Sequence, residues 1–402
     1  MSTPYIWAAP TKDSKLALVW SNSIEESALK QIETIQTHPK LAGDVAIMAD
    51  AHAGVGTVIG SVIPTDRAII PAAIGVDIGC GMTAIKLGIG IETIKEEYPN
   101  GEFFQSIYDF VQKNIPLGFN HRQEEQLEII EDLLGSNVFN EVEKLFKETE
   151  NELNLPRPII NQVGTLGGGN HFIEVQIDEL GYIWLMIHSG SRNMGKVIAD
   201  INIAKAKELG YNAPKDLEYI LYDSKEGKEC IETMDAAISF AEANRKTMAE
   251  LITMHILKEL CPGSKIITRI DTPHNYVSIE EHYGQNMMIH RKGAIKVGSN
   301  FLSIIPGSMG SNSYIVRGNN NKYSYNSASH GAGRVMSRKK AKKTIELSSF
   351  EGVMKNVWSK NIDKTHLDEA PQAYKDIEEV MENQKNLVTI VEKLTPIMNI
   401  KG

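Results

Sequence analysis

The amino-acid sequence predicts an α+β fold in one domain that spans residues 1–402. Short runs rich in valine, isoleucine and threonine, separated by glycine turns, are typical of strands and occur along most of the chain. Fewer, longer segments place apolar residues at helical spacing. Polar residues that suit one chemical site lie on both sides of every candidate boundary, and no repeat or linker is visible. We therefore expect one domain.

The N-terminal part is predicted to consist mainly of strands. Residues 4–20 have the pattern of short strands with turns, and apolar spacing predicts a helix from Ile24 to Ile35. Ser23 and Glu26 have the spacing of a capping box at the start of this helix. Tight glycine turns separate four further expected strands: Val45–Met48, Val58–Ile63, Ala68–Ile70 and Thr83–Leu87.

The middle of the chain has the least regular pattern. Residues 90–155, approximately, are expected to form a variable, partly helical insertion, in which Glu124–Leu153 is charged, helical and exposed. Strands are expected again at His171–Ile177 and Tyr182–His188. A long helix is predicted from Met234 to Leu260, where a proline-glycine pair ends it.

The C-terminal part is predicted to alternate between strands and helices. Apolar, β-branched runs predict four strands: Lys265–Ile270, Asn286–Ile289, Phe301–Ile305 and Tyr314–Val316. Helical spacing predicts two closing helices: Arg338–Leu347 and Ala373–Leu394.

Composition and charge exclude several classes of protein. Apolar residues make up 42% and charged residues 23% of the chain, which is ordinary for a protein with a substantial core. A net charge of −9 argues against nonspecific coating of nucleic acid, although a local basic groove is compatible with it. Three cysteines form no disulfide framework, and neither a signal peptide nor a membrane span is visible. We expect a cytoplasmic protein.

Five separated segments each offer a metal ligand on a glycine-flanked loop. They are GVDIGCG with Asp77 and Cys80, GGGNH with His171, IHSGS with His188, TPHN with His274 and SHGAG with His330. Aspartate, thiolate and imidazole together suit borderline metals such as manganese, zinc or Fe(II). Glycine beside each ligand lets the backbone approach a phosphate. The set therefore predicts metal-assisted chemistry on a phosphorylated substrate.

Each candidate also has a structural alternative. Cys80 alone could be a buried cysteine in a tight turn, and each histidine alone could stabilise a core or a turn. His330 could bind metal or attack phosphorus as a nucleophile. The basic run of residues 338–343 could hold a nucleic-acid backbone or could be a solvated helix face.

A nucleotide would have to bind outside the common sequence motifs. GVGTVIG at residues 54–60 lacks the glycine spacing of a dinucleotide fingerprint, and the chain contains no P-loop. The turn PGSMGS at residues 306–311 could instead form an anion-binding nest. His38 and His255 are expected to be structural, and the pattern around His52 is ambiguous.

The segments together resemble the RtcB family of RNA-splicing and RNA-repair ligases. The match is collinear from about Val45 to Gly402 and is weakest over residues 90–155. It rests on these segments: MADAHAGVGTVIGSVIPT, GVDIGCGM, GTLGGGNHFIEV, HSGSRNMG, HNYV, RKGA, IPGSMGSNSYIVRG, SHGAGRVMSR, YKDIEEVM and the terminal KG.

The resemblance implies a role for each matching residue. Two manganese ions would be held by Asp77, Cys80, His171, His188 and His274, deep in a cleft of a single α+β domain. His330 would be the guanylylated histidine. The family's GTP-contacting positions include His171, His274 and His330, which already have another role. The full set is Asn170, His171, Phe172, Ile173, Glu174, His274, Asn275, Pro306, Gly307, Ser308, Met309, Ser313, His330, Gly331, Ala332, Gly333, Tyr374 and Lys401.

The resemblance also implies a reaction. Family members join RNA ends that carry a 3′-phosphate or a 2′,3′-cyclic phosphate to 5′-hydroxyl ends, using GTP, in RNA repair or tRNA splicing. Within this family, Glu174 could read the guanine N1–H and amine, and Lys401 could donate to O6. Many relatives carry lysine or a large aromatic residue where this chain has Val55, which leaves the natural RNA substrate open. The need for an accessory activating protein is equally open.

Two other functions are to be weighed at this stage. A metallophosphoesterase would use the same ions to hydrolyse cyclic phosphates, but it would need no guanine pocket. A non-catalytic RNA- or nucleotide-binding relative would suit the basic run of residues 338–343, but it would need no full set of metal ligands. Only the ligase predicts a covalent GMP adduct on His330.

Overall fold

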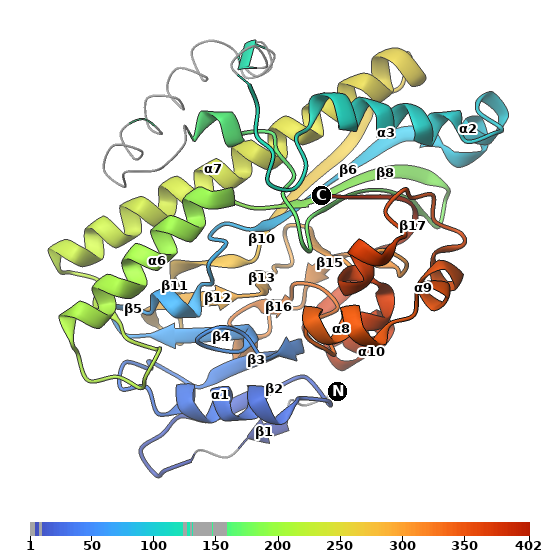
Figure 1. Cartoon of the computed structure of the whole chain (residues 1–402). Coiled ribbons are helices and arrows are strands. Elements are labelled where there is room, and N and C mark those ends of the chain that lie inside the picture. The colour runs from blue at the N-terminus through green and yellow to red at the C-terminus, as the bar shows by residue number, and fades with distance from the viewer. Residues whose placement is uncertain (1–4, 8–9, 124–126, 129–130, 132–146, 148–158) are drawn as a thin grey trace.

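The computed structural model describes residues 5–7, 10–123, 127, 128, 131, 147 and 159–402. Two large sheets and the helices that cover them confirm the predicted α+β class (Figure 1). Within the described residues, all strand pairs in the two large sheets are antiparallel except the pair of β2 and β3. Antiparallel neighbours matter for the site because one edge of such a sheet collects both starts and ends of strands.

The first sheet has six strands. In spatial order they are β1 (Tyr5–Trp7), β2 (Ala17–Val19), β3 (Val45–His52), β4 (Ile59–Thr65), β12 (Gln285–Lys292) and β11 (Asn275–His282). Helix α1 (Glu26–Gln36) packs against β3 and buries Ala28, Ile32 and Ile35. This sheet brings residues 45–65 beside residues 275–292, which are more than two hundred positions away in the chain.

The second sheet has seven strands. In spatial order they are β10 (Ile266–Pro273), β6 (Gly81–Gly90), β8 (Tyr182–Ser189), β7 (Phe172–Asp178), β17 (Val388–Lys401), β15 (Ser313–Gly318) and β14 (Ser303–Ile305). In its third strand, β8, the residues from Ile183 to Ile187 are apolar and buried on both faces of the sheet. Only one residue, His274, separates β10 from β11, so the chain passes from one sheet to the other at this point.

Small strand pairs and short turns complete the connections. β13 (Ala294–Lys296) pairs with β16 (Ser327–Ser329), and β5 (Ala68–Ile69) pairs with β9 (Ile220–Leu221). Single 3-10 turns occupy Pro71–Ala73, Ile160–Gln162, Lys322–Ser324, Lys364–Glu369 and Pro371–Ala373.

Long helices cover one face of the second sheet. α7 (Lys225–His255) continues into a π turn at Ile256–Leu260 and lies across β6 and β8, with α6 (Arg192–Leu209) and α3 (Glu102–Asn114) beside it (Figure 1). Apolar residues of α7 at helical spacing pack on the sheet and form the largest core. The shorter helices α8 (Arg338–Thr344), α9 (Leu347–Met354) and α10 (Ile377–Asn383) gather on the opposite side of the molecule.

One predicted helix is wrong. The sequence pattern over Ala373–Leu394 predicts a single helix, but α10 ends at Asn383 and the chain then forms the long strand β17. The run Val388–Val391 is rich in β-branched residues, and β17 is paired with β15 on one side and β7 on the other. Pairing with β15 and β7 therefore overrides the helical spacing in the second half of this segment.

The predicted capping box at the start of α1 is also wrong. The helix begins at Glu26 with Glu25 as its N-cap residue, and no side chain caps it. The Glu25 carboxylate instead accepts a hydrogen bond from the Ala53 N–H at 2.9 Å, which ties α1 to the loop after β3. Helix α6 was not predicted, and α3 was expected only in general terms, as part of a partly helical insertion.

The expected insertion is only partly described. α2 (Ile91–Glu97) and α3 lie within it, and Phe103, Ile107 and Val111 of α3 are fully buried in the main core. This first part is therefore integral to the domain. The predicted helix at Glu124–Leu153 falls almost entirely outside the described residues.

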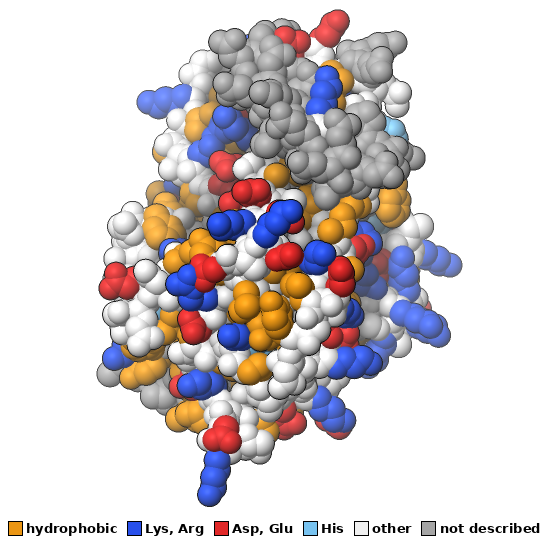
Figure 2. All heavy atoms as spheres, turned by 90° about the vertical axis from the view of Figure 1, so that its left-hand side faces the viewer, with side chains coloured by type: hydrophobic (Ala, Val, Ile, Leu, Met, Phe, Trp, Pro, Cys, Tyr) orange, Lys and Arg blue, Asp and Glu red, His pale blue; other side chains and the backbone are white. Residues whose placement is uncertain are grey.

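The view of the face on the left-hand side of Figure 1 shows acidic and basic side chains interspersed (Figure 2). This face therefore offers no continuous basic track for a polyanion. No described helix combines the length and the hydropathy that a bilayer-spanning segment requires.

His290 on β12 is expected to make the protein less stable as the pH falls. Its buried Nε2 accepts the Ile70 N–H at 3.0 Å, Nδ1 lies 3.2 Å from the Ile63 carbonyl oxygen, and burial lowers its pKa from 6.5 to about 4. The unfolded chain takes up this proton near pH 6.5, whereas the folded chain does so only near pH 4. Stability from this group is thus complete above pH 6.5 and is lost as the pH falls towards 4.

Urea unfolding of the wild type and of His290→Gln at two pH values measures this effect. The stability advantage of the wild type should shrink by about 2 kcal/mol between roughly pH 7 and pH 5, because only the wild type carries the depressed pKa. A difference between the two proteins that is the same at both pH values would contradict the assignment.

Candidate metal and nucleotide site

The candidate ligands converge because of the alternating directions of the strands. β6 and β7 begin, and β8, β10 and β17 end, at the same edge of the seven-stranded sheet, as the strand register shows. The predicted site residues that lie at these ends are Cys80, His171, His188, His274 and Lys401. The corresponding edge of the first sheet carries Asn275 and Lys292. The site lies where these two edges meet.

The metal-ligand candidates form two overlapping groups. Cys80, His188 and His274 make one group, and Asp77, Cys80 and His171 make the other, with the ligand atoms of each group within 4.8 Å of one another. The Cys80 sulfur lies 3.3 Å from Nε2 of His188 and 3.5 Å from Nε2 of His171. All five predicted metal ligands are thus brought together, and Cys80 belongs to both groups.

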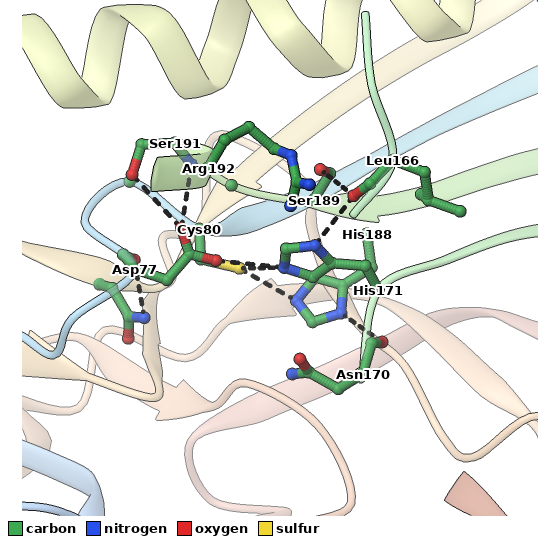
Figure 3. Close-up of polar contacts among 12 residues, drawn as sticks. Asp77, Cys80, Leu166, Asn170, His171, His188, Ser189, Ser191 and Arg192 are labelled. Carbon is green, nitrogen blue, oxygen red and sulfur yellow. Dashed lines mark hydrogen bonds and ion pairs between the residues drawn. The ribbon is translucent and has the colours of Figure 1, made fainter. Parts of the chain in front are cut away.

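Backbone carbonyls fix the orientation of two imidazoles (Figure 3). Nδ1 of His171 lies 2.9 Å from the Leu166 carbonyl oxygen, and Nδ1 of His188 lies 3.1 Å from that of Asn170. A carbonyl oxygen only accepts, so each Nδ1 carries the proton and each Nε2 presents its lone pair to the cluster. Burial, with His171 nearby, lowers the pKa of His188 well below its usual range, which keeps this ring neutral.

Asp77 completes the cluster as an anion. Burial acts to raise the pKa of Asp77, but the interactions with His171, Cys80 and Arg192 together outweigh burial and lower the pKa to about 2. Its carboxylate also accepts the Ser191 N–H at 3.0 Å. A Cβ on Gly190 would lie too close to the carboxylate oxygens, so only glycine leaves room for Asp77 here.

The cluster fits a divalent metal ion. Nε2 of His188 and Nε2 of His274 are only 3.1 Å apart, as expected for ligands that each lie roughly 2.0–2.3 Å from a shared ion. Burial, followed by Asp77, raises the pKa of the Cys80 thiol well above its usual range, so this sulfur needs a cation to become a thiolate. The donor set of nitrogen, sulfur and carboxylate oxygen suits a borderline metal.

Two buried residues of α7 brace the loops that carry these ligands. Asn244 accepts the Thr165 N–H at 2.9 Å and donates to the Gly190 carbonyl at 3.1 Å. Arg245 donates to the Gly79 carbonyl at 2.8 Å and makes a bidentate contact with Asp271. These two residues could not be identified from the sequence, because residues inside a helix carry no local sign of the loops that they support.

A cavity of about 270 Å³ opens beside the cluster. Twelve of the predicted GTP-contacting residues line it: Asn170, Phe172, Pro306, Gly307, Ser308, Met309, His330, Gly331, Ala332, Gly333, Tyr374 and Lys401. We refer to it as the nucleotide cavity. Its lining joins chain segments that are far apart in sequence.

Other predicted contacts lie elsewhere. Ile173 packs in the main core, and Glu174 is only 2% exposed, with its carboxylate bonded to the amides of Asn399 and Gln176. Ser313 accepts from the Gln176 amide at 3.1 Å. Glu174 and Ser313 therefore belong to a buried polar layer that does not line the cavity. Asn275 lines a second cavity, described below.

The turn at residues 306–311 uses several of its backbone donors internally. The Gly307 N–H donates to the Ser313 hydroxyl, the Ser308 N–H donates to the Ser311 hydroxyl, and the Ser311 N–H donates to the Ser308 carbonyl. The segment contributes a wall of the nucleotide cavity through Pro306, Gly307, Ser308 and Met309. The anion nest expected here stays a prediction.

A buried carboxylate that was not predicted organises the far end of the nucleotide cavity. Glu369 lies 3.2 Å from Nζ of Lys401 and accepts the Tyr374 hydroxyl at 2.6 Å. Burial acts to raise the pKa of Glu369, but Lys401, Tyr374, Arg338 and Arg334 together outweigh burial and lower it. Arg334 lies 3.3 Å from the same carboxylate. This network holds the side chains of Lys401 and Tyr374 in place.

His330 lies between the cavity and the metal-ligand cluster. Its ring centroid is 4.8 Å from that of His274, and its Nδ1 lies 2.6 Å from Oδ2 of Asp50. The same oxygen accepts the His330 backbone N–H at 3.2 Å. A carboxylate on Nδ1 leaves Nε2 as the free lone pair. Asp50 was not singled out from sequence, although it lies in MADAHAG, one of the segments on which the resemblance rests.

The histidines with structural alternatives separate clearly. His38 is buried against the Leu217 carbonyl, and burial lowers its pKa to about 4, which confirms a structural role. His255 stacks on Phe110, away from the cluster. His52, the ambiguous one, lines the nucleotide cavity, with its Nδ1 3.0 Å from the Asp50 carbonyl.

Comparison with known proteins gives a consistent result. A family model described as tRNA-splicing ligase RtcB matches residues 31–402. The chain is 35% identical to the RNA-splicing ligase RtcB of Escherichia coli K12, and the match covers 98% of both chains. It is 34% identical to RNA-splicing ligase RtcB1 of a second Escherichia coli strain, again over 98% of both.

An archaeal relative extends the comparison. The chain is 29% identical to the tRNA-splicing ligase RtcB of Nanoarchaeum equitans, over 99% of this chain and 98% of the relative. With this coverage, the matches include the segments that contribute to the cluster and the cavity. The chain therefore belongs to the RtcB family.

Proposed function

We propose that this protein is a GTP- and Mn²⁺-dependent RNA ligase. It would join RNA ends that carry a 3′-phosphate or a 2′,3′-cyclic phosphate to 5′-hydroxyl ends, through GMP bound covalently to His330, in RNA repair or tRNA splicing. The family relationship and the names of its relatives as RNA-splicing and tRNA-splicing ligases support RNA joining.

The position of His330 carries the proposal. Its imidazole borders the nucleotide cavity on one side and the metal-ligand cluster on the other, while Asp50 holds Nδ1. A hydrolase has no use for a nucleophile oriented in this way between a nucleotide-sized cavity and a metal centre. A nucleotidyl-transferring enzyme needs this arrangement, because the α-phosphate must meet both.

The first step forms the protein–GMP bond. Nε2 of His330 attacks the α-phosphate of GTP, and the bond to pyrophosphate breaks. The proton on Nδ1 stays in place, and Asp50 balances the positive charge that develops on the ring. Two Mn²⁺ ions held by Asp77, Cys80, His171, His188 and His274 would neutralise charge on phosphate oxygens and lower the pKa of an attacking hydroxyl.

The later steps move GMP and then release it. An oxygen of the RNA 3′-phosphate attacks the phosphorus, the P–N bond breaks, and its electron pair returns to Nε2. The product carries a 3′-diphosphate linked to guanosine. A 5′-hydroxyl then attacks the RNA phosphate and GMP leaves, which gives an ordinary phosphodiester. A 2′,3′-cyclic phosphate must first be opened by water to enter this sequence.

Guanine recognition would involve the end of the nucleotide cavity near Tyr374. Lys401, held by Glu369, is placed to donate to an acceptor such as O6 of guanine. Glu174 does not line this cavity and its carboxylate is bonded to Gln176 and Asn399, so its expected contact with N1–H is not part of the proposal. Adenine presents an amine where guanine presents O6, so the contact with Lys401 would disfavour ATP.

A labelling experiment tests the proposal. The protein is incubated with Mn²⁺ and GTP labelled at the α-phosphate, denatured and treated with acid or alkali. We expect a label on the protein that is acid-labile and alkali-stable, as a phosphoramidate is, and that is absent from His330→Ala. RNA strands with 3′-phosphate and 5′-hydroxyl ends should then be joined only with GTP. An unlabelled wild-type protein that binds Mn²⁺ and GTP would contradict the proposal.

A further inference from the structure

A second cavity opens onto the same centre from the other side. It has a volume of about 230 Å³ and reaches Asp77, Cys80 and His274 of the metal-ligand cluster as well as His330. Its remaining walls include Val55, Val76, Ile203, Asn275 and Lys292. None of Glu369, Tyr374 and Lys401 lines it, so it is separate from the end of the nucleotide cavity that would hold the base.

The wall of this second cavity contains a buried ammonium group. Lys292 is only 5% exposed, and its Nζ donates to the carbonyl oxygens of Val55 and Ala72. Among the described residues, no carboxylate pairs with it. Lys401 in the nucleotide cavity, by contrast, is paired with Glu369. A buried cation without a counter-charge is costly, and an anionic ligand would offset that cost.

The charge of Lys292 persists at neutral pH. Burial lowers the pKa of its ammonium group to about 8, which still leaves most molecules protonated near pH 7. An ammonium has three N–H donors, and two of them are used by the carbonyls of Val55 and Ala72. The third is available for a phosphate oxygen.

The mouth of the second cavity is apolar. Val55 is 83% exposed and Val76 is 46% exposed, in segments that also contain Gly54, Gly56 and Gly75. Because Lys292 bonds the Val55 carbonyl, it holds this rim in place against the turn at Pro71–Ala73. Apolar side chains can contact a ribose and the face of a base, but they cannot distinguish one base from another.

The chemistry of the two RNA ends differs at their tips. The 3′ end carries a phosphate dianion on its last nucleotide, whereas the 5′-hydroxyl end is uncharged at its tip. A cavity with a cation next to the reacting centre and an apolar mouth matches the 3′-phosphate end. The phosphate would lie inside the cavity, and the ribose and base would lie at its rim. Inside this cavity, which His330 also lines, the 3′-phosphate would lie next to the residue that carries GMP.

We propose that the second cavity binds the RNA end that carries the 3′-phosphate, with Lys292 contacting that phosphate and with Val55 and Val76 contacting the terminal ribose and base. This proposal rests on the proposed ligase function. It adds that the 3′ end is recognised by charge and shape without regard to the terminal base.

Single-step kinetics test this proposal. Protein that already carries labelled GMP is mixed with an RNA decamer ending in 3′-phosphate, and transfer of the label is followed against RNA concentration. Val55→Asp places a negative charge at the exposed rim without touching the core. We expect it to raise the half-saturating concentration of the 3′-phosphate strand at least tenfold, because the new carboxylate repels the incoming phosphate.

Controls make the result decisive. Ile279→Asp, on the exposed edge strand β11 and outside both cavities, should behave as the wild type. Lys292→Gln should also weaken the binding of the 3′-phosphate strand. Decamers with four different terminal bases should have half-saturating concentrations within about threefold of one another. The proposal would be overturned if Val55→Asp left the half-saturating concentration of the 3′-phosphate strand unchanged. It would also be overturned if this variant weakened the binding of GTP or of the 5′-hydroxyl strand alone. Absence of label on the wild-type protein would instead refute the ligase function itself.

Discussion

Replacement of Cys80 with alanine is expected to remove both metal ions and to reduce guanylylation and RNA joining to background. Among the described residues, Cys80 is the one that the two groups of candidate ligands share. Its sulfur lies 3.3 Å and 3.5 Å from nitrogens of the two groups, so as a thiolate it would serve as a ligand in both. Loss of this sulfur would leave two histidines in one group and an aspartate and a histidine in the other.

Variants that remove one group at a time give the matched comparison. His274→Ala should release only the ion of its group, and His171→Ala only the ion bound with Asp77. Metal content after equilibration with Mn²⁺, measured by mass spectrometry and compared with the wild type, separates these outcomes. Cys261→Ala, which changes a buried cysteine far from the cluster, should keep full metal content.

One result would contradict a sulfur that is shared by both groups. Cys80→Ala that retains one tightly bound ion would show that the sulfur serves only one group. Loss of both ions together with loss of folding would show nothing about ligation, so unfolding of the metal-free wild type and the metal-free variant must be compared. Equal stability of these two metal-free proteins, together with unequal metal content, is the expected result.

The metal-ligand candidates could be predicted from the sequence, because each lies in a short segment with a recognisable local pattern. Asp77, Cys80, His171 and His188 have glycines close by in the sequence, and His274 follows a proline. The neighbouring strands could be recognised from their apolar and β-branched runs. Once the strands alternate in direction, their ends must share one edge of the sheet. The ligand set could thus be proposed from five short segments, although neither the register nor the order of the strands could be.

Supporting residues could not be found in the same way. Asn244 and Arg245 lie in the middle of a helix, and their partners at Gly79, Thr165 and Gly190 are 54 to 166 positions away. Glu369 and Asp50 carry no glycine or histidine signature of their own. Their roles arise from distances across the fold, which a single sequence does not encode in any local pattern.

The error at β17 has a related cause. Residues 373–394 satisfy helical spacing, but the second half becomes the strand between β7 and β15. That strand ends at Lys401 beside Phe172 and so delivers the lysine to the nucleotide cavity. A helix in this place would have left Lys401 without a rigid path into the site. Function therefore depends on the element that local spacing predicted incorrectly.

Replacement of Asp50 with asparagine is expected to slow guanylylation of His330 by roughly 10²- to 10⁴-fold. The Asp50 carboxylate lies 2.6 Å from Nδ1 of His330 and fixes the proton there. An asparagine that turned its NH₂ group towards Nδ1 would force the proton onto Nε2 and remove the attacking lone pair. One that presented its oxygen would keep the lone pair but would no longer balance the charge that develops on the ring.

Close packing fixes the position of Asp50 beside His330. A Cβ on Gly333 would clash with the Asp50 carbonyl oxygen, so the segment after His330 packs directly on this residue. The substituted asparagine would therefore occupy the place of the native side chain, and the variant changes charge with little change in shape. Asp66→Asn, at an exposed position after β4, is the control and should guanylylate at the wild-type rate.

The position of the defect in the reaction decides whether Asp50 acts through His330. Only the steps that make or break the P–N bond use this histidine, whereas sealing of RNA that already carries a 3′-diphosphate-linked guanosine does not. Asp50→Asn should therefore seal such pre-activated RNA at close to the wild-type rate while it forms the protein–GMP adduct slowly. Equal slowing of both reactions would mean that Asp50 supports the whole site rather than the nucleophile, and wild-type rates in both would remove it from the mechanism.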